Sequence, residues 1–396
     1  MHALVAFDKF KDALTAREAC RLAAEAFQDA APGAKVTEAP LTDGGEGFAE
    51  ILTSAAGGTL ESVEVSDPRF RPVTAQLGWI ALEALPAAAR ELLDLPAKGR
   101  LAIVEMAQAS GLQLLSADER DPWETSTYGT GQLIGHAAAA GATAILLGIG
   151  GSATNDLGLG ALEALGLQAY QADLQPVPQI TPGKWSQITS LGGLVNAATR
   201  LPPLRIACDV DNPLLGPQGA TAAYGPQKGL QPSDFDRLER GMRKQAARLL
   251  GLFSHPLAEH AERLAEPGSG AAGGIGFGLR NSLADARYVP GFALVEAWLQ
   301  LPAKIAAADL VFTGEGRFDA TSLQGKGPAS VLARALEGGQ AAHLLAGAIT
   351  PQGRAGLPPQ AHAEALSPED LPLAAALSET GARLSAAVRR VAVDLS

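Results

Sequence analysis

The chain has 396 residues, of which 47% are hydrophobic and 18% charged. This length suits about two domains, and the composition excludes general disorder. Lys and Arg number 31 against 42 Asp and Glu, giving a net charge of −11. That balance argues against a nucleic-acid binder and against a protein that adheres to anionic membranes.

The chain shows no sign of secretion or of a membrane span. Its first ten residues lack a basic segment followed by an apolar one. Residues 125–155 carry no charge, but glycines and polar residues interrupt them, so we predict no span there. Two cysteines, Cys20 and Cys208, cannot form a disulfide framework, and both are expected to be buried thiols. We expect a cytoplasmic protein.

The N-terminal part predicts a β-α-β unit. Residues 3–7 form an apolar strand, and Thr15 with Glu18 has the form of a capping box before a helix. A second strand is expected at 35–39, followed by a loop at 42–47 and a helix to about residue 55.

The middle and the end of the chain differ in their pattern of predicted strands and helices. Residues 59–82 alternate apolar and polar side chains, which favours antiparallel strands, and buried strands follow at 101–106, 144–149 and 204–208. Helices are expected at 129–141, from 156, and at 233–252. From about residue 290, strands and helices alternate again. The simplest topology is one doubly wound α/β domain made by both termini, with a domain inserted near 58 that ends near 290.

Glycine-rich segments lie just after strands or before helices. Glycine permits positive φ and close backbone approach, and a helix N-terminus offers free N–H groups, so such loops together predict a phosphate-binding cleft. Each alone also fits an ordinary turn. Acidic residues in or beside them suit Mg²⁺ that joins phosphate to protein. The segments are 42–47, 148–156, 268–276, 313–319 and 325–327, and the acids are Asp43, Glu46, Asp156, Asp209, Glu315 and Asp319.

The common nucleotide motifs are absent or incomplete. No Walker A loop occurs. Residues 148–153 and 268–273 imitate a dinucleotide-binding fingerprint, but Asp173, at the distance of a ribose-binding acid, lies in a Gln- and Pro-rich loop instead of at a strand end. NAD binding is therefore disfavoured. No histidine lies in a motif loop, which disfavours a histidine base.

Taken in order, nine motifs over essentially the whole chain resemble bacterial type I glycerate kinases. They are Asp8–Lys11, Asp43–Gly47, Glu105–Leu112, Gly129–Gly131, Gly148–Asp156, Ala207–Leu214, Gly225–Gly229, Gly270–Gly274 and Thr313–Asp319.

The resemblance implies transfer of the ATP γ-phosphate to D-glycerate, with 2-phosphoglycerate as the favoured product. It also implies two α/β domains with the active site in the cleft between them. One is a flavodoxin-like, doubly wound parallel sheet, predicted at 1–58 plus 290–396. The other is a mixed α/β domain inserted at 59–289.

Four residues depart from the family pattern: Phe7 and Lys9 in the first loop, Leu157 after Asn155-Asp156, and Thr321 in place of a common Gln. These changes bear on substrate details more than on phosphoryl transfer.

The motif residues divide into predicted roles. The predicted catalytic residues are Asp8, Lys11, Asp43 and Arg317, with Asp8 as the weak choice of general base and Asp43 its competitor. Lys11, Arg317 and Lys326 are candidate partners of the glycerate carboxylate, or else surface charges. Metal candidates are Asp43, Asp209 and Glu315, and Asp209 could equally form a cap near Asn212.

Two further assignments stay open: Ser152, Thr154 and Asn155 suit phosphate donors or a helix cap, and Glu105 suits a ligand or a buried anchor. The predicted substrate- and nucleotide-binding residues are Gly44, Gly45, Glu46, Gly150, Gly151, Ser152, Thr154, Asn155, Asp156, Gly273, Gly274, Gly314, Glu315, Asp319 and Lys326.

The sequence thus predicts an ATP- and Mg²⁺-dependent phosphotransferase with an alcohol acceptor, acting on small molecules. The alternative is a non-catalytic protein of the same fold that binds a sugar acid or nucleotide. An NAD-dependent dehydrogenase is less favoured. The residues leave the oligomeric state open.

Overall fold

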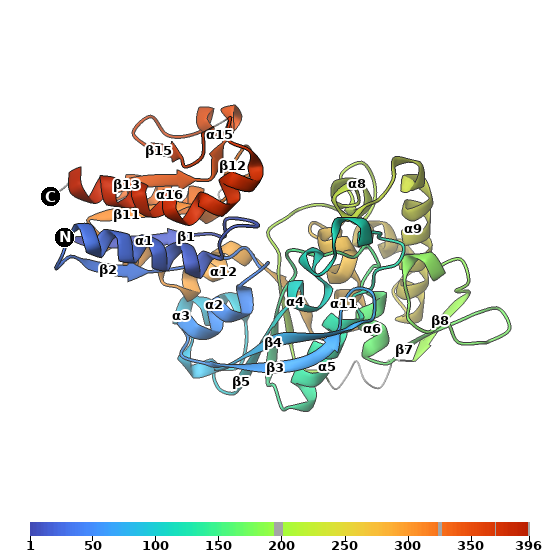
Figure 1. Ribbon diagram of the computed structural model, residues 1–396. Coiled ribbons are helices and arrows are strands. Elements are labelled where there is room, and N and C mark those ends of the chain that lie inside the picture. The colour runs from blue at the N-terminus through green and yellow to red at the C-terminus, as the bar shows by residue number, and fades with distance from the viewer. Residues whose placement is uncertain (194–200, 324–326, 369, 395–396) are drawn as a thin grey trace. The chain divides into compact units, whose positions relative to one another are not determined.

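The structure is a computed structural model that describes the chain except residues 194–200, 324–326, 369 and 395–396 (Figure 1). It contains two compact units: unit 1 comprises Met1–Asp43 and Val295–Ser396, and unit 2 comprises Gly44–Leu294. The first division lies at residue 43, not at 58, because α2 (Phe48–Ala55) packs against β4 (Pro72–Ala81) and β5 (Arg100–Glu105). The second lies within α12 (Gly291–Trp298), close to the predicted residue 290.

Unit 1 is built on a sheet of five parallel strands in the order β15-β13-β11-β1-β2. Numbered along the chain, this is the order 2-1-3-4-5 of the flavodoxin-like fold, as predicted. The order reverses between β1 and β11, which makes that pair the topological switch point. The strands are β1 (His2–Phe7), β2 (Lys35–Glu38), β11 (Leu310–Gly314), β13 (Ala341–Ala346) and β15 (His362–Ala365), with a separate parallel pair, β12 (Arg317–Phe318) and β14 (Ala348–Ile349).

Helices cover both faces of this sheet. The predicted capping box begins α1 (Ala16–Ala30): the Thr15 side chain accepts from the Glu18 N–H, and the Glu18 carboxylate accepts from the Thr15 N–H. In Figure 1, α1 and α16 (Leu373–Asp394) lie side by side, and their apolar faces share one buried cluster with β1 and β11. Right-handed crossovers place α14 on the opposite face, because β1-to-β2 and β11-to-β13 run in opposite directions across the sheet. The remaining helices are α13 (Leu301–Ala306), α14 (Gly327–Glu337) and α15 (Pro351–Ala355).

Unit 2 is built on a six-stranded mixed sheet in the order β10-β9-β6-β5-β4-β3. As predicted, the first two strands form an antiparallel pair, and β4 also runs antiparallel to β5. The strands of this sheet from β5 onward are parallel, and the central strand β6 is wholly apolar and buried, as expected where both faces are covered. The further strands are β3 (Thr59–Ser66), β6 (Ala144–Gly148), β9 (Leu204–Ala207) and β10 (Ala286–Val289), with a separate antiparallel pair, β7 (Leu167–Tyr170) and β8 (Ser190–Gly193).

The helices of unit 2 pack around its own apolar core, which draws on residues between 63 and 286. No helix in the described ranges is long and apolar enough to cross a membrane. The helices are α3 (Ala87–Leu93), α4 (Ala107–Ser110), α5 (Tyr128–Ala139), α6 (Leu159–Ala164), α8 (Ala220–Tyr224), α9 (Phe235–Leu252), α10 (His260–Ala265) and α11 (Ile275–Ser282).

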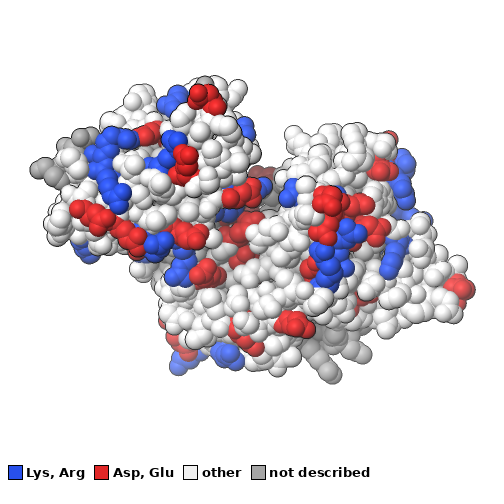
Figure 2. Space-filling view, viewed as in Figure 1, with Lys and Arg blue, Asp and Glu red and all other residues white. Residues whose placement is uncertain are grey.

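Charges of both signs are interspersed on the surface drawn in Figure 2. Exposed ion pairs follow α1 and α16, such as Arg21 with Glu25 and Arg389 with Asp29.

Candidate active site

In unit 1, the predicted catalytic loops follow the two strands at the switch point. Asp8 comes directly after β1 and Glu315 directly after β11. The Asp8 N–H donates to the Gly314 carbonyl over 2.9 Å, and the Gly316 N–H donates to the Lys9 carbonyl over 3.2 Å. Ligands of open α/β sheets bind outside the carboxyl ends of the strands at such a point. The fold thus places these loops where a ligand is expected.

Glycine is required at one close approach between these loops. A Cβ on Gly316 would lie 2.9 Å from the Lys11 backbone nitrogen, closer than real Cβ atoms come. The loop after β11 therefore packs directly on the backbone of the loop after β1. The Lys11 side chain itself is exposed.

Four carboxylates gather at this edge of the sheet. Burial, together with the negative charges of Asp8, Asp319 and Asp43, raises the pKa of Glu315 to about 7. Among the described residues, Glu315 Oε1 is buried without a hydrogen-bond partner. Asp8 is nearly buried, and its Oδ1 accepts the Lys9 N–H over 2.6 Å. The edge thus concentrates negative charge that a bound cation would neutralise.

Lys9, one of the departures from the family pattern, forms an ion pair with a predicted metal ligand. Its Nζ lies 3.1 Å from Asp43 Oδ1. Asp43 is 55% exposed, so this pair leaves the carboxylate accessible to a ligand. Lys9 therefore balances part of the acidic charge of unit 1.

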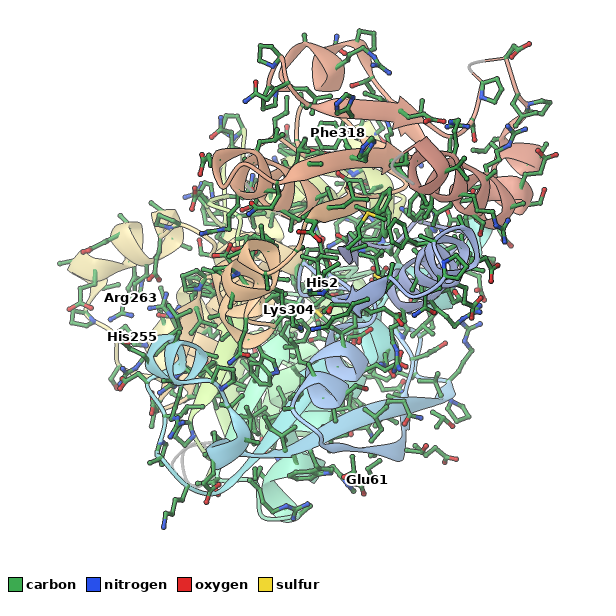
Figure 3. All side chains as sticks on the ribbon, turned by 90° about the vertical axis from the view of Figure 1, so that its left-hand side faces the viewer. His2, Glu61, His255, Arg263, Lys304 and Phe318 are labelled. Atoms are coloured by element: carbon green, nitrogen blue, oxygen red, sulfur yellow. The ribbon has the colours of Figure 1, made fainter. Side chains whose placement is uncertain are left out.

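Arg317 and Asp319 lie on either side of a buried residue, Phe318, which anchors this segment. Phe318 on β12, labelled in Figure 3, is fully buried, while the Arg317 side chain is 72% exposed. Asp319 Oδ1 accepts from the Thr321 hydroxyl over 2.6 Å and from its N–H over 2.8 Å. The hydroxyl bond is the main reason that the pKa of Asp319 is lowered. The Thr321 departure therefore orients Asp319. Lys326 lies outside the described residues.

In unit 2, the first glycine-rich loop lies against the loop that follows β6. The Gly150 N–H donates to the Gly44 carbonyl over 2.9 Å. A Cβ on Gly150 would come within 2.6 Å of the Gly45 nitrogen, and one on Gly151 within 2.8 Å of Glu46 Oε1. The structure therefore brings together the predicted binding residues 44–46 and 150–151, which lie far apart in the sequence. Ser152, the next residue, is largely buried.

Glu105 serves as a buried anchor beneath this pair of loops. It ends β5, is 1% exposed, and accepts the N–H groups of Gly47 and Ala49 over 3.2 and 3.1 Å. These N–H groups belong to the first turn of α2, so the carboxylate caps that helix from a distant strand. Burial raises the pKa of Glu105 to about 7.

Asp156, predicted as a ligand-binding residue, is committed to the protein instead. It is fully buried, and its carboxylate accepts from the Thr127 N–H and hydroxyl and from the N–H groups of Gly158 and Gly160. Four donors leave little capacity for a ligand, and we therefore assign Asp156 a structural role. The helix expected from residue 156 begins at Leu159, because Leu157 and Gly158 have φ of 62° and 71°.

The comparisons with known proteins agree with this architecture. The model of the glycerate kinase family matches residues 3–396. The chain belongs to the glycerate kinase family.

Its similarity to individual members is extensive. It is 38% identical to a glycerate kinase of Bacillus subtilis over 84% of this chain and 81% of the relative. It is 35% identical to the glycerate 2-kinase of Escherichia coli, with the same coverage. A crystal structure from Salmonella typhimurium LT2, of a protein assigned as glycerate kinase 2, has a TM-score of 0.74, 34% identity, and coverage of 100% of this chain and 98% of that one.

Within this glycerate kinase family member, Gly273 and Gly274 lie against the loop after β6. A Cβ on Gly273 would lie 2.0 Å from the Thr154 carbonyl oxygen, and one on Gly274 would lie 3.3 Å from the Leu157 Cα. Their φ values of 73° and 89° also favour glycine. These residues shape the buried side of the loop that holds Thr154 and Asn155.

Asp209, the third metal candidate, caps a helix. Its Oδ2 accepts the Phe292 N–H over 2.7 Å at the start of α12, and a Cβ on Gly291 would come within 2.6 Å of the same oxygen. It lies in unit 2, whereas Asp43 and Glu315 lie in unit 1. Asp209 was expected to form a local cap near Asn212; it instead caps α12, which lies far along the chain.

The carboxylates of unit 1 suit Mg²⁺. In the described part of the chain no three His, Cys, Asp or Glu side chains are arranged to enclose a metal ion. Mg²⁺ typically takes only one or two carboxylates and completes its shell with water and substrate phosphates. The unpartnered buried oxygen of Glu315 beside three other acids fits that mode.

One buried residue of the site was not selected from the sequence. Lys228 is 1% exposed, and its Nζ donates to the Thr154 carbonyl and to Asn155 Oδ1. The signal was present in the motif Gly225–Gly229, in which glycines flank the lysine. Lysine is so rarely buried that the sequence alone favours a surface position.

Proposed function

We propose that this member of the glycerate kinase family transfers the γ-phosphate of ATP to a hydroxyl group of D-glycerate. The observation that carries the proposal is the acidic edge at the β1–β11 switch point, where Glu315 has a buried oxygen without a partner among the described residues, beside Asp8, Asp43 and Asp319. Such a cluster suits a metal-bound phosphoryl group, since phosphoryl transfer requires positioning and charge neutralisation above all. ATP is supplied in the cytoplasm, where we place the reaction.

Backbone amides would hold the phosphates in this proposal. Gly44 and Gly151 are the proposed donors, and the two loops that carry them are fixed to each other because the Gly150 N–H donates to the Gly44 carbonyl. Preorganised N–H donors stabilise charge without reorganisation during the reaction. Gly314 lets the chain turn toward Glu315 at a φ of 157°.

Asp8 is the proposed general base. The glycerate hydroxyl oxygen attacks the γ-phosphorus, the bond from phosphorus to the ADP oxygen breaks, and the hydroxyl proton passes to the Asp8 carboxylate. Lys11, in the loop after β1, and Arg317, which follows the loop after β11, are exposed cations. We propose them as partners of the glycerate carboxylate.

Asp43 and Glu315 are the proposed Mg²⁺ ligands. The ion would neutralise phosphate charge and polarise the transferring group. Asp209 is omitted because its carboxylate caps α12.

The 2-hydroxyl is the proposed phosphate acceptor, supported by the name of the Escherichia coli relative, glycerate 2-kinase. The test is a coupled ADP-release assay with D-glycerate, ATP and Mg²⁺, followed by NMR of the product. Phosphorus coupled to the single C2 proton supports the proposal, whereas coupling to the C3 protons moves the reaction to the 3-hydroxyl. Binding of ATP without turnover would favour a non-catalytic binding protein.

Asp43→Asn tests the metal assignment. Removing one carboxylate charge should lower kcat by about 100-fold or more while the thermal midpoint stays close to that of the parent. Asp12→Asn is the matched control, since Asp12 is exposed in the same unit and Asn tolerates its φ of 62°. Near-normal turnover of Asp43→Asn would remove this carboxylate from the mechanism.

A further inference from the structure

Lys228 is a buried cation that the reaction described above does not use. It ends the 3₁₀ turn Pro226–Lys228 and is 1% exposed. Its position is fixed on both sides: the Lys228 N–H donates to the Gly225 carbonyl, and a Cβ on Gly229 would lie 1.9 Å from the Arg120 carbonyl oxygen. Burying a lysine amine costs free energy unless the amine is hydrogen-bonded or paired with an opposite charge.

Both partners of the amine belong to the loop that follows β6. Nζ lies 2.6 Å from the Thr154 carbonyl oxygen and 3.0 Å from Asn155 Oδ1. These two bonds fix the path of the backbone and the orientation of the Asn155 amide. Gly151, whose amide we propose to hold phosphate, lies a few residues before them in the same loop.

The two residues that accept from this amine also carry unsatisfied polar groups in the described part of the chain. Asn155 Nδ2 and Thr154 Oγ1 are buried donors without a hydrogen-bond partner in the part of the chain that the structure describes. The groups that face the amine are Asp156, whose carboxylate accepts from other residues, and the Tyr224 ring of α8, centred 5.8 Å from Nζ. Two unsatisfied donors and a buried amine, in a chain of net charge −11, suit an anion on the adjacent loop.

We propose that Lys228 is a positioning residue for the nucleotide. Its amine holds the loop through Thr154 and Asn155, and its positive charge beneath the loop attracts the polyphosphate. This inference rests on the proposed function, in which that loop binds ATP. Lys228 would act on ATP and not on glycerate, because both of its bonds go to the nucleotide loop.

The first experiment separates the two substrates. Lys228→Met keeps the length of the side chain but removes both bonds and the charge, and Gln227→Met is the control on the exposed side of the same turn. We expect Lys228→Met to raise the KM for ATP about tenfold or more, with the KM for glycerate within about threefold of the parent value. Folded Lys228→Met with unchanged KM values, or with both raised equally, would show a merely structural role.

The second experiment needs no destabilising variant. Burial lowers the pKa of Lys228 to about 7. The amine is charged below this value, so its attraction for phosphate should be lost as the pH rises above it. With excess Mg²⁺ keeping ADP fully ionised, calorimetry should show the Kd for ADP rising about fivefold or more between roughly pH 6.5 and 8.5.

Lys228→Arg, which stays charged, should make that rise smaller, and the part that remains belongs to Glu105 and Glu315, whose pKa values are also about 7. A Kd for the parent protein that is constant or falls over this range would overturn the inference, whether or not the variants fold. If the parent turns over glycerate but the Lys228 variants bind ATP normally, only the inference fails. If the parent shows no turnover, the proposed function fails, and the ADP titration still reports on Lys228.

Discussion

Individual carboxylates in this protein take their roles from their partners more than from their neighbours in the sequence. The Asp43 carboxylate is accessible to solvent, and one oxygen of Glu315 has no hydrogen-bond partner among the described residues. Asp156 and Asp209 carry the same chemical group in similar motifs, yet they cap a buried loop and a helix. Motif position alone therefore identifies the region of a site, and hydrogen-bond partners decide which of its acids are available to a ligand.

Glu105 offers a prediction on pH dependence. Its folded pKa of about 7 lies above the ordinary value of 4.5, so the unfolded chain releases this proton at lower pH than the folded protein. Its contribution to stability is therefore fully present below about pH 4.5 and is lost as the pH rises to about 7, by roughly 3 kcal/mol at most.

Glu105→Gln cannot ionise, so its thermal midpoint should rise relative to that of the parent between about pH 5 and pH 8. Tryptophan fluorescence can follow unit 2, which contains Trp79, Trp123 and Trp185. Glu64→Gln, on the exposed side of β3, changes the same charge and serves as the control. A difference between parent and Glu105→Gln that stays constant with pH would contradict the burial argument.

At the residue scale, the sequence predicted which loops hold the polar groups. It did not predict which of these groups form hydrogen bonds within the protein and are therefore not available to a ligand. The capping box of Thr15 and Glu18 was readable because both partners lie within one turn. The partners of Asp156 include Thr127, and those of Lys228 are Thr154 and Asn155, so their bonds depend on how distant segments meet. No local pattern records such a meeting.

At the scale of elements, the apolar strands were predictable from local patterns, whereas their order could be expected only through the family resemblance. Buried runs such as β6 and β11 stand out by composition, and the alternation in β3 and β4 marks a surface pair. The short pair β12–β14 has only two residues in each strand, too few to show a period. The sheet order emerges only from the pairing of β1 with β11, whose residues Ala3 and Leu310 stand opposite each other.

Arg205 on β9 ties three elements together and supports a stability prediction. Its side chain is 2% exposed, and it donates to the Leu93 and Asp94 carbonyls at the end of α3 and to Asp285 before β10. Arg205→Met would leave buried carbonyl groups without a donor, so we expect a loss of about 3 kcal/mol in the free energy of unfolding of unit 2.

The adjacent strand supplies the control. Arg287 stands opposite Arg205 in the sheet and also pairs with Asp285, but it is 58% exposed. Arg287→Met should cost less than about 1 kcal/mol, because exposed ion pairs contribute little. Urea unfolding monitored by tryptophan fluorescence measures both. Equal losses for the two variants would show that burial is not what makes the Arg205 contacts stabilising.

At the scale of the whole molecule, the chain makes one unit from its two termini and another from its middle. The strands of unit 1 meet across the entire insertion, since β1 pairs with β11. If the segment between β1 and β11 were disordered, pairing these strands would require closing a very long loop, at a cost in chain entropy. A folded unit 2 fixes most of that segment, so fewer residues remain to be ordered when the strands pair. We therefore expect unit 2 to fold without help from unit 1.

A fragment of residues 44–294 tests this expectation. It contains the six-stranded sheet and the apolar core between residues 63 and 286, so it should show a cooperative thermal transition by circular dichroism and the near-ultraviolet signal of packed aromatic side chains. It lacks Asp8, Asp43 and Glu315, so it should release no ADP with glycerate in an assay in which the full chain is active. A fragment without a cooperative transition would show that unit 2 depends on unit 1. A folded fragment with turnover would remove the acidic edge of unit 1 from the chemistry.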